Sequence, residues 1–574
     1  MALSEIRTAN ATTAQFLHIT DLHVDPLYIP TAGPNTNCHS RNSFYVKNPL
    51  PVYGIADSGC DSPIRLIDET FKSLDLTNVD FILWTGDSSR HDRDNNRRKQ
   101  RLETYEHNRI AVELYTKYIP LNDIPVIPTI GNWDVFPVSA LACLEQGDPQ
   151  LENLWSVWEP LFPHGHPETE LAKSTFLKGG YFSRNVLDEF VQVLSLNSLS
   201  FFNENPLVSD CAKFNLLPYG ERPWDPLHVG DAQLIWMEGL LAEARRMGTK
   251  VVVQGHVSPM GNAVQLWKEE CFEWYVYLAG EYSDVILGHY FGHINRDLVH
   301  VISQRHPLSN HDSDKPHKNK KKKHHKRHDS LPTYPPPSAA STKPHQINPF
   351  RLTTLVPNII KSFDLKNYKI IDAMYTGSSI VPAYNPGYRI GTLTFSPLSL
   401  PSSATADKSP ENGWTVSLTS HKTMYVNINK ANKLAAQNSS YELEYLPSCD
   451  TQLDYGMQDL SGESIESWLG ILQSAFPNSE KGTEGAKLLR RYTKCIETSL
   501  GVAWDNVTRE PIDVSVGNGG DDGEILDKGL VGIVFAVFAV WFFGLLVWGY
   551  WRRGRGGYMG CGEEEEGERR PLLG

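Results

Sequence analysis

Residues 80–87 read DFILWTGD, a short apolar run that stops at a glycine followed by a carboxylate. Four other apolar runs end in a similar way: 15–21 (QFLHITD), 125–132 (PVIPTIGN), 250–256 (KVVVQGH) and 284–293 (DVILGHYFGH). Such runs, bounded by turn residues, are typical of buried β-strands. Three stretches between them have the pattern of amphipathic helices: 64–76, 98–118 and 232–247. This alternation predicts an α/β fold.

Each predicted strand is followed by side chains that bind metal ions. The carboxyl ends of strands form the ligand-binding edge of open α/β sheets, so these side chains are expected to lie together. Carboxylate, amide and imidazole donors suit Zn, Mn, Fe or Mg better than metals that prefer thiolates. Two such ions about 3.5–4 Å apart can hold the attacking and leaving oxygens of a phosphoryl group. The candidate ligands are Asp21, His23, Asp87, Asn132, His256 and His293.

The ordered motifs Asp-x-His, Gly-Asp, Gly-Asn, Gly-His and Gly-His resemble the calcineurin-like metallophosphoesterase superfamily over about residues 16–297. Residues 86–92 (GDSSRHD), 290–293 (YFGH) and 385–389 (NPGYR) resemble its acid-sphingomyelinase-like branch. Within that branch, residues 131–137 (GNWDVFP) are similar to the fungal endopolyphosphatases. The resemblance implies a metallophosphoesterase β-sandwich flanked by helices. It also implies two divalent metal ions (Mn, Mg, Zn or Co) and cleavage of internal phosphoanhydride bonds of inorganic polyphosphate.

The resemblance also implies a role for each ligand. Asp21 and His23 would bind the first metal, Asp87 would bridge the two metals, and Asn132, His256 and His293 would bind the second. Asn295 stands where a second histidine usually completes the first metal site. An amide oxygen is a weaker donor than imidazole, so we expect a looser or more Mg/Mn-like first site.

A second departure from the family pattern is Trp133, which stands where a histidine commonly protonates the leaving group. His91 is then the best candidate to contact the phosphate or donate a proton. Its alternative is an ordinary surface histidine. His289 is a further possibility, or it lines the second metal's surroundings. Asp134 either supports the ligands or only shapes a turn.

A membrane span is predicted near the C-terminus. Residues 529–551 are 23 residues without a charge, long enough to cross the roughly 30 Å hydrocarbon core. A buried core helix is the alternative. Arg552, Arg553 and Arg555 follow at once, so the positive-inside rule places the tail in the cytosol and the large N-terminal part in a lumen. The end of the tail resembles a dileucine signal for sorting adaptors, with the vacuole membrane as the expected location; its residues are Glu568, Leu572 and Leu573.

Three sequons and seven of the eight cysteines precede this span, as expected for a lumenal, disulfide-permissive part. The predicted glycosylation sites are Asn10, Asn438 and Asn506. Cys38–Cys60 and Cys449–Cys495 are the expected local disulfides. Residues 1–15 contain no apolar run of signal-peptide length. We therefore expect a natural start further upstream; translocation by the C-terminal span, with a different topology, is the alternative.

The net charge of −13 hides one basic segment. Residues 305–351 contain 11 Lys/Arg and 3 Asp/Glu, a local charge of +8. An acidic body with one basic island argues against a general nucleic-acid binder. The island predicts either a polyanion tether or a solvated, protease-sensitive loop. The tether residues would be Lys318, Lys320, Lys321, Lys322, Lys323, Lys326 and Arg327.

The chain therefore divides into seven predicted segments: a core (15–304), a disordered insertion (305–350), further strands of the catalytic domain (351–430), a partly helical subdomain (431–515), a stalk (516–528), the span (529–551) and the tail (552–574). The leading functional hypothesis is a vacuolar endopolyphosphatase. A sphingomyelin-type or nucleotide phosphodiesterase is the second hypothesis. The third is a membrane-anchored polyanion-binding protein whose catalytic site is weakened at Trp133 and Asn295.

Overall fold

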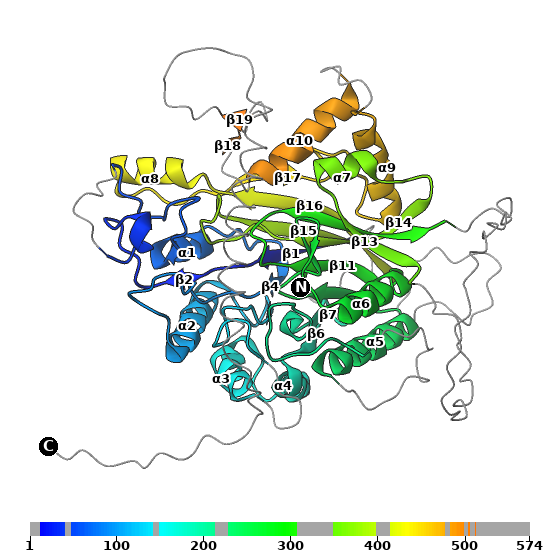
Figure 1. Cartoon of the computed structure of the whole chain (residues 1–574), viewed down its shortest axis with the longest axis horizontal. Helices are drawn as coiled ribbons and strands as arrows, with labels where there is room; N and C mark the ends of the chain where they lie inside the picture. The colour runs from blue at the N-terminus through cyan, green and yellow to red at the C-terminus, as the bar shows by residue number, and fades with distance from the viewer. Residues whose placement is uncertain are drawn as a thin grey trace, which may run out of the picture. The chain divides into compact units, whose positions relative to one another are not determined.

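The computed structural model describes residues 12–40, 48–141, 148–212, 228–306, 348–397, 414–476, 483–498, 503–504 and 511–512 (Figure 1). Its centre is formed by two large β-sheets with helices around them. The predicted α/β class is therefore confirmed.

The first sheet has six strands in the order β17-β16-β15-β1-β4-β5. β1 runs parallel to β4, and β4 runs parallel to β5, whereas β15 and β16 are antiparallel to their neighbours. The bounds are β17 Leu446–Asp450, β16 Trp414–Tyr425, β15 Gly387–Pro397, β1 Thr12–Ile19, β4 Val79–Trp84 and β5 Val126–Pro128.

The second sheet has seven strands in the order β13-β12-β14-β11-β8-β7-β6. Its central strands β14, β11, β8 and β7 run parallel, and antiparallel strands lie at both edges. The bounds are β13 Phe350–Thr354, β12 Leu298–Arg305, β14 Tyr368–Thr376, β11 Ile286–Phe291, β8 Lys250–Gln254, β7 Val191–Ser195 and β6 Phe182–Val186.

The two sheets face each other across a buried layer. The Phe16 ring of β1 lies edge-on to Tyr290 of β11, with ring centroids 5.2 Å apart. The Gln254 amide at the end of β8 donates to the carbonyl of Ile127 in β5 at 3.0 Å. Because this hydrogen bond joins strands of different sheets, it fixes their carboxyl ends against each other.

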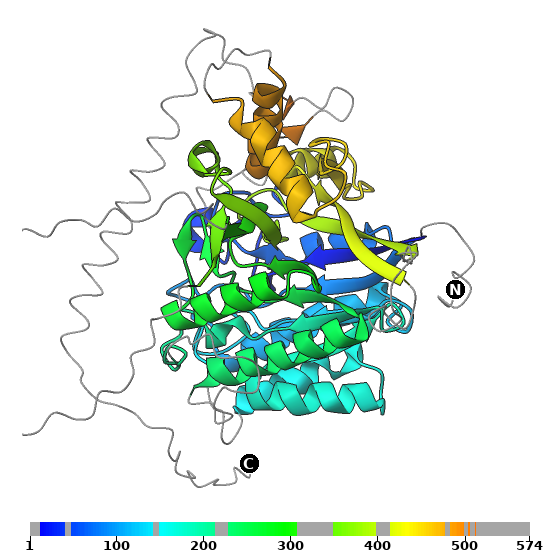
Figure 2. The ribbon, with the colours of Figure 1, turned by 90° about the vertical axis from the view of Figure 1, so that its right-hand side faces the viewer.

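Helices cover the outer faces of this sandwich (Figure 2). Trp84 of β4 contacts Tyr115 and Trp158, which binds two helices to the first sheet. The helices are α1 Ile64–Lys72, α2 Arg101–Tyr118, α3 Pro149–Trp158, α4 Pro167–Gly179, α5 Val229–Met247, α6 Glu269–Glu281, α7 Pro357–Ser362, α8 Ile428–Gln437, α9 Gly462–Gln473 and α10 Glu484–Thr498. Short strand pairs complete the list: β2 Val24–Asp25, β3 Ser62–Pro63, β9 Met260–Gly261, β10 Val264–Gln265, β18 Ala503–Trp504 and β19 Pro511–Ile512.

All five predicted strands that precede a ligand are present, as β1, β4, β5, β8 and β11. The three predicted helices are confirmed as α1, α2 and α5. The alternating stretch 370–396 contains two strands that belong to different sheets, β14 and β15. The predicted limits of the seven segments stay predictions.

Several predictions fall on residues that the structure does not describe. No helix in the described part of the chain is long and apolar enough to cross a bilayer. The predicted span 529–551, the stalk, the tail and the tether residues 318–327 lie outside the described residues, as do Asn10, Asn506, Cys143 and Cys561. Asn438 is described and is exposed at the end of α8.

Three disulfides join described cysteines. Cys38–Cys60 and Cys449–Cys495 confirm the two predicted local pairs. The third, Cys211–Cys271, joins residues 60 apart and attaches the segment before α5 to the start of α6.

Candidate metal centre

The candidate ligands all follow the carboxyl ends of strands. Asp21, His23, Asp87 and Asn132 follow strands of the first sheet, and His256, His293 and Asn295 follow strands of the second. Five of them adopt a positive φ, from 40° to 68°: Asp21, His23, Asp87, His293 and Asn295. This backbone region costs on the order of 1–3 kcal/mol per non-glycine residue and is concentrated at functional sites. These residues therefore adopt unfavourable backbone conformations that place their side chains at the candidate site.

The first group of side chains contains Asp21, His23 and Asp87. His23 Nε2 lies 3.6 Å from Asp21 Oδ1 and 3.5 Å from Asp87 Oδ2. His23 Nδ1 lies 2.9 Å from the carbonyl oxygen of Ser89, to which it donates its proton. This bond leaves the lone pair on Nε2 facing the carboxylates, as a metal ligand requires.

The second group shares Asp87 with the first. His256 Nε2 lies 3.1 Å from Asp87 Oδ2, and Asn132 Oδ1 lies 3.0 Å from the same nitrogen. Asn132 Oδ1 is also 2.9 Å from His293 Nδ1. The structure thus brings the six predicted ligands into two adjoining groups around Asp87 Oδ2.

The residues present fit divalent cations. Asp21 Oδ1 and Asn295 Oδ1 are buried and have no hydrogen-bond partner in the described part of the chain, a costly state unless another ligand binds them. Burial opposes a charge on His256, yet Asp87 raises the pKa of its imidazole to about 9. The carboxylates therefore stabilise a positive charge on the neighbouring His256. A divalent cation would supply a positive charge at the same place.

Two glycines allow the ligand loops to approach each other. A Cβ atom on Gly131 would lie 2.2 Å from the backbone nitrogen of Asp87. A Cβ atom on Gly292 would lie 2.1 Å from Thr20 Oγ1 and 2.6 Å from Asp21 Oδ2. Larger residues at either position would push the ligand loops apart.

Asp134 supports the ligand loops from beneath. Its Oδ2 accepts from the backbone nitrogens of Asp87 and Gly131, each at 2.8 Å. Its Oδ1 accepts from the backbone nitrogen of Ser88 at 2.8 Å and from the Asn108 side chain at 3.0 Å. The carboxylate is fully buried. Of the two predicted roles, the structure favours support of the ligands.

We expect Asp134→Asn to lower the free energy of unfolding by about 3 kcal/mol, because an amide leaves two of the four donors facing its NH₂ group. Chemical denaturation followed by circular dichroism measures this change. Asp123→Asn, at an exposed position, is the matched control and should stay within about 0.5 kcal/mol of the wild type. Equal stability of the two variants would contradict the supporting role.

His91 lies against the first group. Its ring stacks on His23, with centroids 3.9 Å apart, and its Nδ1 lies 2.7 Å from Asp61 Oδ1. Asp61 Oδ2 also accepts from the backbone nitrogen of His91 at 2.7 Å. Burial lowers the pKa of His91 to about 4, against the opposite effect of Asp61. A His–Asp pair at this place is a candidate for proton transfer, and the surface alternative for His91 is wrong because the side chain is only 11% exposed.

His289 does not reach the site. It is fully buried, with Nδ1 2.7 Å from the Tyr275 hydroxyl of α6 and Nε2 3.1 Å from Asp372 Oδ2. Alternate residues of a strand point to opposite faces, and its neighbour Tyr290 faces the layer between the sheets. His289 therefore points to the helix-covered face, and the predicted role for it is wrong.

Trp133 is held next to the centre by a buried lysine. Its backbone nitrogen donates to Asp87 Oδ1 at 2.7 Å, and the Lys99 ammonium lies 4.8 Å from its ring centroid. Lys99 Nζ donates to Ser89 Oγ at 3.1 Å and to the Trp133 carbonyl at 3.0 Å. Burial lowers the pKa of Lys99 to about 8, although Asp134 and Asp87 favour its charge. The Lys99 ammonium thus lies beside Trp133, the position where the family resemblance predicts a histidine.

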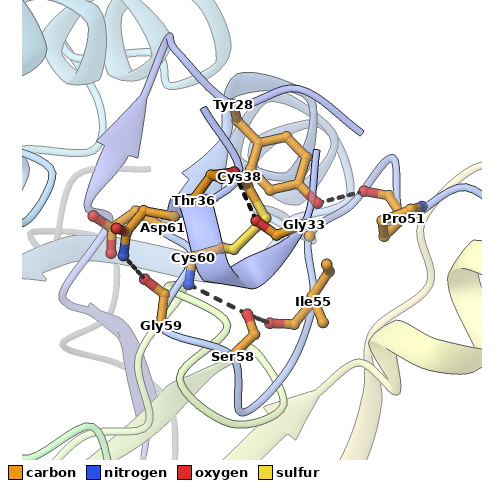
Figure 3. The surroundings of a disulfide bond; sticks show 12 residues. Tyr28, Gly33, Thr36, Cys38, Pro51, Ile55, Ser58, Gly59, Cys60 and Asp61 are labelled. Atoms are coloured by element: carbon orange, nitrogen blue, oxygen red, sulfur yellow. Dashed lines mark hydrogen bonds between the residues drawn. A yellow bond between two sulfur atoms is a disulfide. The ribbon is translucent and has the colours of Figure 1, made fainter. Parts of the chain in front are cut away.

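A disulfide stabilises the loop that carries Asp61. Figure 3 shows the Cys38–Cys60 bond directly before Asp61, with the Cys60 nitrogen donating to Ser58 Oγ at 3.3 Å. The Tyr28 hydroxyl donates to the Pro51 carbonyl at 2.8 Å beside it (Figure 3). Because Asp61 positions His91, the disulfide contributes to the order of the site.

We expect a Cys38→Ser/Cys60→Ser variant to lose about 3 kcal/mol of unfolding free energy, since the bond closes a 22-residue separation. Thermal unfolding under non-reducing conditions tests this. A Cys449→Ser/Cys495→Ser variant, which removes a bond distant in sequence from Asp61, is the control for the site. Turnover of polyphosphate is measured for both variants as well. Equal changes in turnover would show that the disulfide next to Asp61 has no special effect on His91.

Sequence reasoning did not single out Asp61, Lys99 or the Arg389–Asp297 ion pair as parts of the site. Arg389 of β15 is buried and also donates to the carbonyl of Thr376, so it joins the two sheets beneath the loop that carries Asn295. Asp61 directly follows a predicted half-cystine, which was the available signal. No sequence signal distinguishes Lys99 from its exposed basic neighbours.

Residues 14–294 match the family model of the calcineurin-like phosphoesterases. The match spans 281 of the 574 residues, and over this range the chain is similar to the calcineurin-like phosphoesterases. The two sheets also contain β12 to β17, which lie beyond the matched residues.

Curated relatives from several fungi carry the name endopolyphosphatase. The chain is 31% identical over 296 residues to the one from Saccharomyces cerevisiae (49% of the chain, 40% of the relative). It is 33% identical over 323 residues to the one from Debaryomyces hansenii (53% and 40%) and 32% identical over 294 residues to the one from Schizosaccharomyces pombe (49% and 47%). The matched part of the chain thus spans less than half the length of these relatives.

The solved structures that match the chain have low sequence identity and low TM-scores. PhoD is 10% identical with a TM-score of 0.32, covering 73% of this chain and 70% of that chain. A dimetal phosphatase from Danio rerio is also 10% identical with a TM-score of 0.32, covering 66% and 95%.

Proposed function

We propose that the chain is a metal-dependent endopolyphosphatase that cleaves internal phosphoanhydride bonds of inorganic polyphosphate. The observation that carries the proposal is the convergence of ligands from two sheets on Asp87 Oδ2, next to a His–Asp pair. The names of the fungal relatives support polyphosphate as the substrate.

The proposed roles of the side chains follow their grouping. Two divalent ions would supply Lewis acidity and a nucleophile at neutral pH. Asp87 would belong to both ion sites; Asp21, His23 and Asn295 would complete the first, and Asn132, His256 and His293 the second. Hydrogen bonds of His23 to the Ser89 carbonyl (2.9 Å) and of His256 to the Thr85 carbonyl (2.7 Å) orient both imidazoles for this role.

Proton transfer to the leaving group would fall to the protonated form of His91, which becomes abundant as the pH falls toward its pKa of about 4. The indole of Trp133 cannot act as a general acid toward a phosphate oxygen. Its ring lies next to that of His91, with ring centroids 5.0 Å apart. A phosphate chain is a good leaving group, so cleavage of an anhydride needs less help from an acid than cleavage of an ester. This is why a site with Trp133 suits polyphosphate better than a phosphodiester with an alcohol leaving group.

The test is incubation of the purified chain with long-chain polyphosphate, sphingomyelin and a nitrophenyl phosphodiester, in the presence of Mn, Mg, Zn or Co. Shortening of polyphosphate to products of intermediate length, seen on gels, supports the proposal. Turnover of sphingomyelin or of the phosphodiester alone favours the phosphodiesterase hypothesis. Binding of polyphosphate without metal-dependent turnover favours the weakened polyanion-binding protein.

We further propose that residues 529–551 anchor the chain in the vacuole membrane with the phosphoesterase domain in the lumen. The support is the 23-residue uncharged run followed by Arg552, Arg553 and Arg555. Carbonate extraction and protease protection of vacuole-enriched membranes test this. Release by carbonate, or digestion of the domain in sealed vesicles, would contradict the proposal.

A further inference from the structure

The segment that links His91 to α2 is rich in exposed arginines. We call residues 92–101 the arginine loop; it contains five Lys/Arg and two Asp, a net charge of +3 in a chain of net charge −13. Arg93, Arg97, Arg98 and Arg101 are exposed, and Lys99 is buried. This cationic surface belongs to the folded domain and is separate from the predicted tether at 318–327.

Both ends of the arginine loop are attached to the metal centre. At its start, His91 stacks on His23, and Arg93 Nη1 lies 3.7 Å from Asp61 Oδ1. Near its end, Lys99 donates to the carbonyl of Trp133, whose backbone nitrogen bonds Asp87. The arginine loop is therefore attached at both ends to residues that contact the candidate ligands.

Both carboxylates of the loop already have partners within the domain. Asp94 is buried and accepts from His39 Nδ1 and from the Asn96 nitrogen, each at 2.8 Å. Asp92 accepts from the Lys99 nitrogen at 2.7 Å and pairs with Arg98 at 2.8 Å. In the described part of the chain, no carboxylate pairs with Arg97 or Arg101, so their charges face solvent uncompensated.

The position of these charges does not favour stability. Arg101 is the first residue of α2, where the helix dipole repels cations; Glu103, in the same turn, accepts a hydrogen bond from the Gln100 nitrogen as part of a capping box. Arg97 and Arg98 lie just before the same helix start. Cations at this end of a helix cost stability, so an anionic partner gives a reason for their presence.

We propose that the arginine loop binds linear polyphosphate outside the metal centre and leads the chain of phosphates to it. This inference rests on the proposed function and names the surface that selects long substrates. Polyphosphate matches the loop because its negative charge repeats along a flexible chain. An internal phosphate of a bound chain can then lie at the ligands while phosphates further along the same chain contact Arg97 and Arg101. Such binding by exposed cations depends steeply on salt.

The test compares Arg97→Glu/Arg101→Glu with Lys361→Glu/Lys366→Glu, a charge-matched control on α7 and the loop after it, well away from α2 in Figure 1. Arg97→Lys/Arg101→Lys retains the charge. The full chain is used with Mn²⁺, and KM and kcat are measured for long-chain polyphosphate and a nitrophenyl phosphodiester at several salt concentrations. Binding of long-chain polyphosphate and of phosphatidylserine vesicles is measured separately in EDTA, where no hydrolysis occurs.

We expect the loop reversal to raise KM for long-chain polyphosphate by roughly tenfold more than for the small phosphodiester, with a shallower salt dependence. The lysine variant and the α7 control should stay within about twofold of the wild type. Equal effects of the loop reversal and the α7 control would overturn the inference, as would unchanged polyphosphate binding in EDTA. Loss of vesicle binding with polyphosphate binding intact would also overturn it and assign the loop to a membrane surface.

The binding measurement separates the two proposals. If the wild type hydrolyses no polyphosphate, the proposed function fails. Loss of polyphosphate binding in EDTA on loop reversal would still support the arginine loop as a polyphosphate surface. Failure of the wild type to bind polyphosphate would overturn the loop inference whatever the enzyme hydrolyses.

Discussion

An Asp87→Asn variant should hydrolyse long-chain polyphosphate on the order of a thousandfold more slowly than the wild type. Asp87 Oδ2 is the atom that both ligand groups share, 3.5 Å from His23 Nε2 and 3.1 Å from His256 Nε2. Asparagine keeps the size of the side chain, and its oxygen can still accept from the Trp133 nitrogen as Asp87 Oδ1 does at 2.7 Å. An NH₂ group then occupies the shared position, where it repels cations.

The readouts are kcat on polyphosphate and metal content measured by mass spectrometry after dialysis. We expect the metal-to-protein ratio to fall together with kcat, while the unfolding temperature measured in EDTA changes little. Asp188→Asn, at an exposed turn, is the matched control and should keep both activity and metal. Full metal content with full activity in Asp87→Asn would rule out a shared ligand at this position.

The strands and their ligands were predictable because local patterns encode them. Each buried strand is a short apolar run, and each ligand follows at the turn where the run ends. Parallel pairing brings the turns of each sheet to one edge, and the two sheets face each other with these edges joined at Gln254 and Ile127. Asp21, Asp87 and His256 therefore meet although up to 235 residues separate them. The same period-two reasoning, applied to His289, would have placed it on the helix-covered face opposite Tyr290.

The supporting residues were not predictable because their roles come from contacts distant in sequence. Asp61 meets His91 across 30 residues, and Lys99 meets the Trp133 carbonyl across 34. Cys211–Cys271 forms because the segment before α5 and the start of α6 meet in the fold. A sequence shows neither a buried ammonium nor a tertiary approach of this kind.

Trp133 stands where the family resemblance predicts a histidine, and its surroundings are cationic. Lys99 is buried against the Trp133 ring, and the exposed arginines continue from Lys99 along the same loop. A site with a tryptophan at this place and cations beside it is less suited to poor leaving groups and better suited to a polyanion. Substrate preference would therefore be set by charge next to the metals as much as by the ligands themselves.

His91→Gln should reduce kcat by an amount that depends on the leaving group. For long-chain polyphosphate we expect a loss of about tenfold, because the departing phosphate needs little protonation. For phosphodiesters with phenol leaving groups we expect a loss of about a hundredfold or more, growing as the phenol becomes less acidic. The measurement is a series of nitrophenyl to phenyl phosphodiesters, compared with polyphosphate under the same metal conditions.

The series distinguishes proton transfer from simple positioning. Glutamine can still hydrogen-bond Asp61, whose Oδ1 lies 2.7 Å from His91 Nδ1, but its amide has no proton to transfer to a leaving group. A loss that is the same for every leaving group would show that His91 only positions the substrate or stacks on His23. His164→Gln, at an exposed histidine, should leave the whole series unchanged. A steeper dependence on leaving-group acidity in His91→Gln alone would identify His91 as the proton donor, and Asp61→Asn should then show the same trend with a smaller amplitude.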